Sequence, residues 1–197
     1  MRTIIAAVAF IFILGAVHDV KAGSIKGKIG MPGATNLENF VVYVDGIKGT
    51  FPVPAKRPEM NHLNLQFVPR NIAVLKGTTV DFPNSDNVLH SAFSISPSNP
   101  FELGIYGKGH EKFVTFKNSG LVELFCHIHS HMHAYVLALD NPFFSMTAKD
   151  GGYMISNLPN GTHTVKAWAG PSDTMEKTVT INGEETVSLD FAFVTKK

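Results

Sequence analysis

Short apolar runs separated by turn-forming residues repeat along almost the whole chain. The runs are rich in Val, Ile, Phe and Tyr, and Gly, Pro, Asn or Asp breaks them. We find no long stretch with the 3.6-residue apolar period of an amphipathic helix. Many short strands at regular spacing are typical of β-sandwiches and barrels, so the pattern predicts an all-β chain.

The predicted strands cover residues 24–29, 40–44, 63–67, 72–75, 79–82, 113–116, 122–125, 135–139, 153–155, 164–169, 176–181 and 186–191. Tight turns are expected at residues 150–152, Asp-Gly-Gly, and at Asn160-Gly161, because glycine adopts the positive φ that hairpins require. Asn160 also begins a glycosylation acceptor pattern, Asn-Gly-Thr. Its place between two strands favours the turn.

The N-terminus has the organisation of a secretory signal peptide. Arg2 precedes an apolar stretch over residues 4–17, and the small residue Ala22 precedes Gly23. The stretch is shorter than the roughly 20 residues of a membrane-spanning helix, so cleavage after Ala22 is favoured over a retained anchor. We therefore expect a periplasmic or secreted protein with no membrane span once residues 1–22 are removed.

The balance of basic and acidic residues limits which functions the sequence allows. The chain has 17 basic and 16 acidic residues, a net charge of +1, and no basic stripe. This balance argues against nucleic acid as a partner. The acidic residues are dispersed and suggest no acid–base pair, so we expect that the protein is not an enzyme. We also expect a monomer.

Cys126 is the only cysteine of the chain. In an exported protein a lone cysteine is a buried inert thiol, is paired with another molecule, or binds a metal. The potential ligands near it are His127, His129, His131, Met132 and His133, with His90 upstream. This surrounding set favours metal binding.

The spacing of Cys126, His129 and Met132 excludes a continuous strand. Residue 129 would point to the opposite face of a strand from residues 126 and 132, so the segment must curl after Phe125. His90 would then supply a fourth ligand from a separate connection. Thiolate, imidazole and thioether ligands together favour copper; zinc is the competitor, and Met132 argues against it.

Two stretches resemble the cupredoxin family in the style of plastocyanin, amicyanin and pseudoazurin. They are residues 80–86, Val-Asp-Phe-Pro-Asn-Ser-Asp, followed by His90, and residues 125–132, Phe-Cys-His-Ile-His-Ser-His-Met. They are most similar to exported proteins labelled as methylamine-utilisation proteins. The resemblance covers about residues 61–140 and implies a Greek-key β-sandwich with one type 1 copper ion.

By this resemblance, His90, Cys126 and His129 are equatorial copper ligands and Met132 is the weak axial ligand. Many relatives carry Asn directly after the first histidine and Pro directly after the second. Here these positions are Ser91 and Ser130. The Asn normally ties the two ligand loops together by hydrogen bonds, so a different arrangement around the ligands is expected.

The outer parts of the chain resemble a different family, the carboxypeptidase-regulatory-like or transthyretin-like β-sandwich. The similar stretches are residues 149–155 and 158–165, together with a strand pair at 23–29 and 39–44. We therefore predict a cupredoxin domain over residues 57–142. It is inserted into a second, small β-sandwich made of residues 23–56 and 143–197.

The predicted function is one-electron transfer between transient redox partner proteins. A first alternative is copper binding or delivery, in which His127, His131 and His133 form a secondary metal site. Solvent-exposed loop histidines are the simpler interpretation of these three. A second alternative is a cell-surface module whose metal is structural. For His62 we expect a surface or hydrogen-bonded role.

Overall fold

The computed structural model describes residues 22–194, so the predicted signal peptide lies, apart from Ala22, outside the described residues. In the described range the chain forms seventeen β-strands and no helix. The predicted all-β class is therefore confirmed. No segment among residues 22–194 is a helix that could cross a membrane.

The first β-sandwich is built from the two ends of the described chain. One sheet contains β1 (Ala22–Gly30), β13 (Gly152–Pro159), β16 (Thr186–Ser188) and β17 (Phe191–Ala192), with β1 in the centre. The facing sheet has the order β12 (Phe144–Met146), β2 (Val41–Asp45), β14 (Gly161–Gly170) and β15 (Asp173–Ile181). Apolar side chains such as Ile25, Val44, Val165 and Ile181 fill the space between the two sheets.

The second β-sandwich is built from the middle of the chain. Its larger sheet has the order β5 (Asn71–Leu75), β11 (His133–Leu139), β10 (Gly120–Phe125), β7 (His90–Ser94) and β8 (Phe101–Tyr106). The opposite layer contains the pairs β3 (Asn61–Leu63) with β4 (Gln66–Val68) and β6 (Thr79–Pro83) with β9 (Glu111–Thr115). A bridge between His62 and Asn84 joins these two pairs. Phe82, Leu124 and Val136 belong to the core between the layers.

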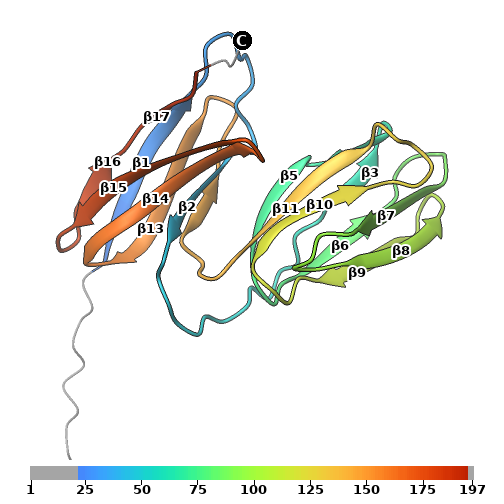
Figure 1. The fold of residues 1–197 in the computed structure, drawn as a ribbon, viewed down its shortest axis with the longest axis horizontal. Helices are drawn as coiled ribbons and strands as arrows, with labels where there is room; N and C mark the ends of the chain where they lie inside the picture. Colours follow the sequence, from blue (N-terminus) through green and yellow to red (C-terminus); the bar gives the residue numbers. More distant parts are fainter. Residues whose placement is uncertain (1–21, 195–197) are drawn as a thin grey trace, which may run out of the picture.

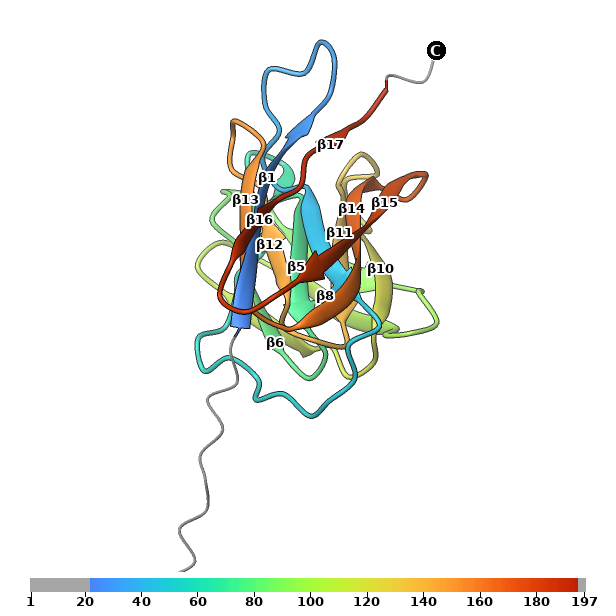
Figure 2. The same ribbon diagram turned by 90° about the vertical axis from the view of Figure 1, so that its left-hand side faces the viewer.

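The two sandwiches also pack against each other, side by side in Figure 1 and one behind the other in Figure 2. Successive side chains of a strand point to opposite faces, and β11 uses both. Its Val136 faces the second sandwich's own core, whereas Leu137 and Leu139 join Val41 and Trp168 of the first sandwich. The fold is therefore a stack of four sheet layers with three apolar interfaces.

Three strands, β7, β8 and β12, were not predicted from the pattern. Residues 63–67, predicted as one strand, instead contain the end of β3, a turn and the start of β4. The turn forms because Asn64 and Leu65 have φ values of 55° and 57°, which no strand allows. The domain boundaries at residues 57 and 142, and the family of the first sandwich, stay predictions.

Candidate metal centre

The potential ligands gather at one end of the second sandwich. β10 ends at Phe125 and β11 begins at His133, and these two residues are paired across the strands. Residues 126–132 form the loop between them, at the end that lies away from the first sandwich (Figure 1). The Met132 N–H donates to the carbonyl of His129 at 2.9 Å, which closes the curl predicted from the spacing.

His90 reaches the same point from β7, whose Phe93 pairs with Phe125 of β10. The Cys126 sulfur lies 4.0 Å from Nδ1 of His90 and 3.9 Å from Nδ1 of His129, and the two nitrogens are 3.2 Å apart. The centre of this triangle is about 2.2 Å from each donor, between the metal–nitrogen and metal–sulfur bond lengths of about 2.0–2.1 and 2.3 Å found for zinc. The three donors therefore fit a single metal ion.

This group stands apart in the described structure. Within residues 22–194, His90, Cys126 and His129 are the one set of three or more His, Cys, Asp or Glu side chains that converge closely enough to hold a metal. His90 is 0% exposed and Cys126 is 5% exposed, whereas His129 is partly exposed. His129 is thus the donor that connects the buried cluster with the surface.

The surroundings of Cys126 favour its thiolate. Burial raises the pKa of the thiol, but hydrogen bonds from the backbone of Ser91 and His129 to the sulfur are the largest causes that lower it, and the pKa is about 6. The sulfur is consequently an anion near neutral pH. A thiolate is the form that binds a metal.

Ser91 ties the loop of Cys126 to the strand of His90. Its N–H and its hydroxyl both point to the Cys126 sulfur, at 3.5 and 3.8 Å. The hydroxyl oxygen also accepts the N–H of His127 at 2.9 Å. The serine therefore supplies a link of the kind that the resemblance assigns to Asn in many relatives.

Asp86 contacts the outer nitrogen of His90. Its Oδ2 lies 2.9 Å from Nε2 of His90, opposite the Nδ1 that faces Cys126. Burial raises the pKa of the Asp86 carboxyl, but the amides of Leu65 and Asn64 and the His90 ring hold it below its ordinary value overall. In the sequence, Asp86 ends the stretch 80–86 that resembles the cupredoxin family, but nothing in that stretch indicates its contact with His90.

His62 is a second residue near the centre whose place the sequence did not reveal. It is completely buried and its ring stacks on His90, with centroids 5.0 Å apart and an interplanar angle of 17°. Its Nδ1 lies 3.1 Å from the carbonyl oxygen of Pro83. The hydrogen-bonded role expected for His62 is found, but in the core and not at the surface.

Met132, the predicted axial ligand, is also buried at this end. It is 1% exposed and belongs to the same apolar cluster as Cys126. Its backbone position is fixed by the hydrogen bond to His129. Its role as a ligand stays a prediction.

The three histidines predicted as a possible secondary site point to different partners. The pairs are His127 with Glu102 at 2.6 Å, His131 with the carbonyl of Leu65 at 3.1 Å, and His133 with Glu123 at 2.6 Å. His127 also stacks on Phe93 with centroids 3.9 Å apart, and His133 stacks on Phe125. They do not converge on one point in this structure.

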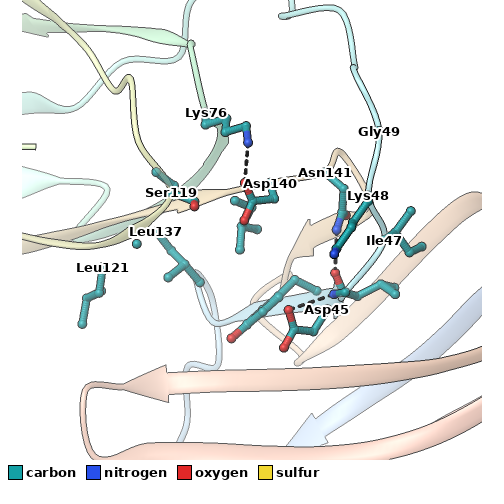
Figure 3. Close-up of a pocket in the computed structure, with 16 residues that line it drawn as sticks. Asp45, Ile47, Lys48, Gly49, Lys76, Ser119, Leu121, Leu137, Asp140 and Asn141 are labelled. Carbon is teal, nitrogen blue, oxygen red and sulfur yellow. Dashed lines mark hydrogen bonds and ion pairs between the residues drawn. The ribbon is translucent and has the colours of Figure 1, made fainter. Parts of the chain in front are cut away.

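A cavity of about 630 Å³ lies between the two sandwiches (Figure 3). It lies at the end of β11, whereas the loop of Cys126 precedes the start of that strand. Strand β2 and the loop after it form one wall, and the end of β11 forms the other. Two of its carboxylates are already paired, Asp140 with Lys76 at 2.6 Å and Asp45 with Lys166 at 2.5 Å. The convergent chemistry is at the metal centre and not in this cavity.

No protein-family model matches the chain, and no curated protein sequence does. Among solved structures, the chain is similar to the Cu-containing nitrite reductase (NirK) from Thermus scotoductus SA-01, with 22% identity over 49% of this chain and 25% of that chain and a TM-score of 0.42. The matched part is therefore only a quarter of the reductase.

Two smaller copper proteins are similar over a larger share of their own length. A purple cupredoxin from Nitrosopumilus maritimus is 24% identical over 39% of this chain and 84% of that chain, with a TM-score of 0.35. The copper(I) structure of an amicyanin mutant is 14% identical over 50% of this chain and 98% of that chain, with a TM-score of 0.41.

Proposed function

We propose that this protein is an exported one-electron carrier with one type 1 copper ion held by His90, Cys126, His129 and Met132. The observation that carries the proposal is the convergence of one sulfur and two Nδ1 atoms on a point about 2.2 Å from each, the bond length expected of a metal. A thiolate and two imidazoles with a nearby methionine are the ligands of a blue-copper electron-transfer site.

Each residue has a distinct part in this proposal. The soft sulfur of the Cys126 thiolate suits Cu(I), and the imidazoles of His90 and His129 suit Cu(II). This mixed set of ligands can therefore bind copper in both oxidation states. Copper supplies the one-electron couple. Four protein ligands leave no open position for a substrate, so we propose electron transfer and not catalysis.

The exposed surface around the ligands supports transient docking of redox partner proteins. Leu89, beside His90, is 54% exposed, and Ile128, beside His129, is 43% exposed. Val88 and Leu65 add 44% and 40% exposed side chains at the same end. Apolar side chains gathered on a surface mark interaction sites. We propose that a partner docks here and exchanges its electron through His129.

The test is to load the full chain with Cu(II) and record its visible spectrum and its cyclic voltammogram. We expect an intense thiolate-to-copper absorption band that disappears on reduction and returns on reoxidation. The Cys126→Ser variant should fold but lack the band. The His127→Ala variant is the matched control and should keep it, because His127 pairs with Glu102 and not with the cluster.

Other outcomes point to the alternatives. Tight copper binding without reversible cycling would contradict electron transfer and favour copper delivery. A Cys126→Ser protein that does not fold would indicate a structural metal. A band that the His127→Ala change abolishes would contradict the proposed ligand set.

A further inference from the structure

We propose that Asp86 is a positioning residue for copper that fixes the orientation of the His90 ring and lowers the reduction potential of the site. The inference rests on the proposed copper function. It concerns a contact outside the ligand set, the hydrogen bond of 2.9 Å between Asp86 Oδ2 and His90 Nε2. His90 is 0% exposed and the Asp86 side chain is 12% exposed, so water competes little for this bond.

The carboxylate is itself held in place from a separate part of the chain. The N–H of Asn64 donates to its Oδ1 at 2.7 Å, and the N–H of Leu65 donates to its Oδ2 at 2.9 Å. The N–H of Asp86 donates to the side chain of Asn84 at 2.9 Å. Asp86 is therefore fixed before any metal binds.

The hairpin of β3 and β4 supplies both of these amides. They point to Asp86 because Asn64 and Leu65 adopt positive φ at the turn. The same hairpin carries His62, whose ring covers one face of the His90 ring. The hairpin thus fixes His90 at its outer nitrogen and on its face, from residues more than twenty positions away in sequence.

The bond assigns the tautomer of His90. A carboxylate only accepts hydrogen bonds, so Nε2 carries the proton and Nδ1 has a free lone pair. Nδ1 is the nitrogen that faces Cys126 and His129. A carboxylate on the outer nitrogen makes a histidine ligand a stronger donor. Its negative charge also favours Cu(II) over Cu(I), which lowers the reduction potential.

The test compares wild type with Asp86→Asn in the copper-loaded full chain. Loss of such a partner typically weakens metal binding about 10- to 100-fold. We expect most of this loss in the affinity for Cu(II) and little in the affinity for Cu(I). Each tenfold difference between the two corresponds to a rise in potential of about 59 mV. Voltammetry and copper competition titrations measure both quantities.

Glu102→Gln is the matched control. Glu102 pairs with His127, the neighbour of Cys126, so this variant removes one negative charge at the same end of the molecule without touching His90. We expect its potential to stay near that of wild type. An equal rise of the reduction potential in both variants would mean that the lost negative charge alone sets the potential. An unchanged potential in Asp86→Asn would mean that the bond to His90 does not affect it. Either result overturns the inference.

Nitrogen NMR of the metal-free protein gives a second, independent measurement. We expect wild-type His90 to be protonated at Nε2, and a spectrum showing the proton at Nδ1 would overturn the inference even if Asp86→Asn fails to fold. A wild-type protein that gives no blue site would contradict the proposed function. A blue wild type with an unshifted variant would contradict only the role of Asp86.

Discussion

Ser91 is one of two positions, with Ser130, at which this chain departs from the cupredoxin pattern that it resembles. Its hydroxyl contacts both the Cys126 sulfur and the N–H of His127. The Ser91→Ala variant loses the contact to the Cys126 sulfur and leaves the N–H of His127 without its acceptor. Hydrogen bonds to a copper-bound thiolate tune the potential, and their loss should lower it because Cu(I) is stabilised less. Voltammetry should show a lower potential, and chemical denaturation a loss of about 1 kcal/mol.

Ser96→Ala is the matched control for this prediction. The Ser96 hydroxyl accepts the N–H of Glu123 at 2.9 Å, a similar bond to β10, the strand that precedes the loop of His127, and it does not touch Cys126. We expect a similar loss of stability and an unchanged potential. If both variants shift the potential alike, the effect comes from loosening of the sheet and not from the sulfur contact.

His62 should make the metal-free protein sensitive to acid. Burial is the largest cause that lowers its pKa, from 6.5 to about 4, so the unfolded state binds the proton more readily than the folded state. The contribution to stability is complete above pH 6.5 and is lost as the pH falls from 6.5 to about 4. The shift corresponds to about 3 kcal/mol.

Urea denaturation at several pH values checks this. Between pH 6.5 and about 4, the free energy of unfolding should fall by about 3 kcal/mol less in His62→Phe than in wild type. Phe67→Leu is the control, since Phe67 packs against His62 with ring centroids 4.9 Å apart but does not titrate. It should lower stability at every pH without changing the slope. An unchanged slope in His62→Phe would show that other groups carry the acid sensitivity.

The residues of the centre differ in whether the sequence near them is enough to predict their role. Cys126, His129 and Met132 follow from spacing within one loop, and His90 from its motif, so sequence reasoning could propose them. Asp86 and His62 act through contacts that only the folded backbone creates. A carboxylate four residues before a histidine, or an isolated histidine between Asn61 and Leu63, has no periodicity that separates such roles from a surface position.

At the scale of the element, the β3–β4 hairpin shows why the strand prediction failed there. Residues 63–67 alternate apolar and polar side chains, which is the pattern of a strand. Asn64 tolerates positive φ, but Leu65 does so only at a cost. The turn persists because its two amides bind the Asp86 carboxylate. A long-range contact has overridden the local preference.

This strain leads to a prediction for Leu65→Gly. Glycine adopts a φ of 57° without the penalty of a β-carbon, and the Leu65 side chain is 40% exposed, so little packing is lost. We expect the variant to be more stable by up to about 1 kcal/mol, measured by thermal or chemical denaturation. The backbone amide remains, so the copper potential should not change.

Leu63→Gly provides the comparison within the same hairpin. Leu63 lies in β3 and is 36% exposed, close to the exposure of Leu65, but it is not among the residues with positive φ. There glycine should destabilise by about 0.5–1 kcal/mol through the extra freedom of the unfolded chain. Two variants that change stability in the same direction would contradict the strain at Leu65.

At the scale of the molecule, the interface between the sandwiches determines whether they behave as one unit. Trp168 of β14 is 4% exposed and meets Tyr135 of β11 edge to face, with ring centroids 5.6 Å apart. Val41 and Leu139 complete the buried contact. The apolar pattern of the sequence correctly predicted β2 and β11 as strands. It did not reveal that the faces of β2 and β11 that point away from their own cores meet each other, because any apolar partner can cover such a face.

Trp168→Ala should separate the unfolding of the two sandwiches. Removing a buried tryptophan costs about 3–5 kcal/mol, and here the loss falls on the contact between the sandwiches and not within one core. In the metal-free wild type we expect a single calorimetric transition, with equal calorimetric and van 't Hoff enthalpies. In Trp168→Ala we expect two transitions.

Val165→Ala is the matched control, because Val165 is on the same strand but faces the core of the first sandwich. It should lower the melting temperature and keep a single transition, since a cavity inside one sandwich weakens that sandwich without removing the surface that couples it to the other. A single transition in Trp168→Ala would mean that the linking segments, and not this interface, make the molecule one cooperative unit.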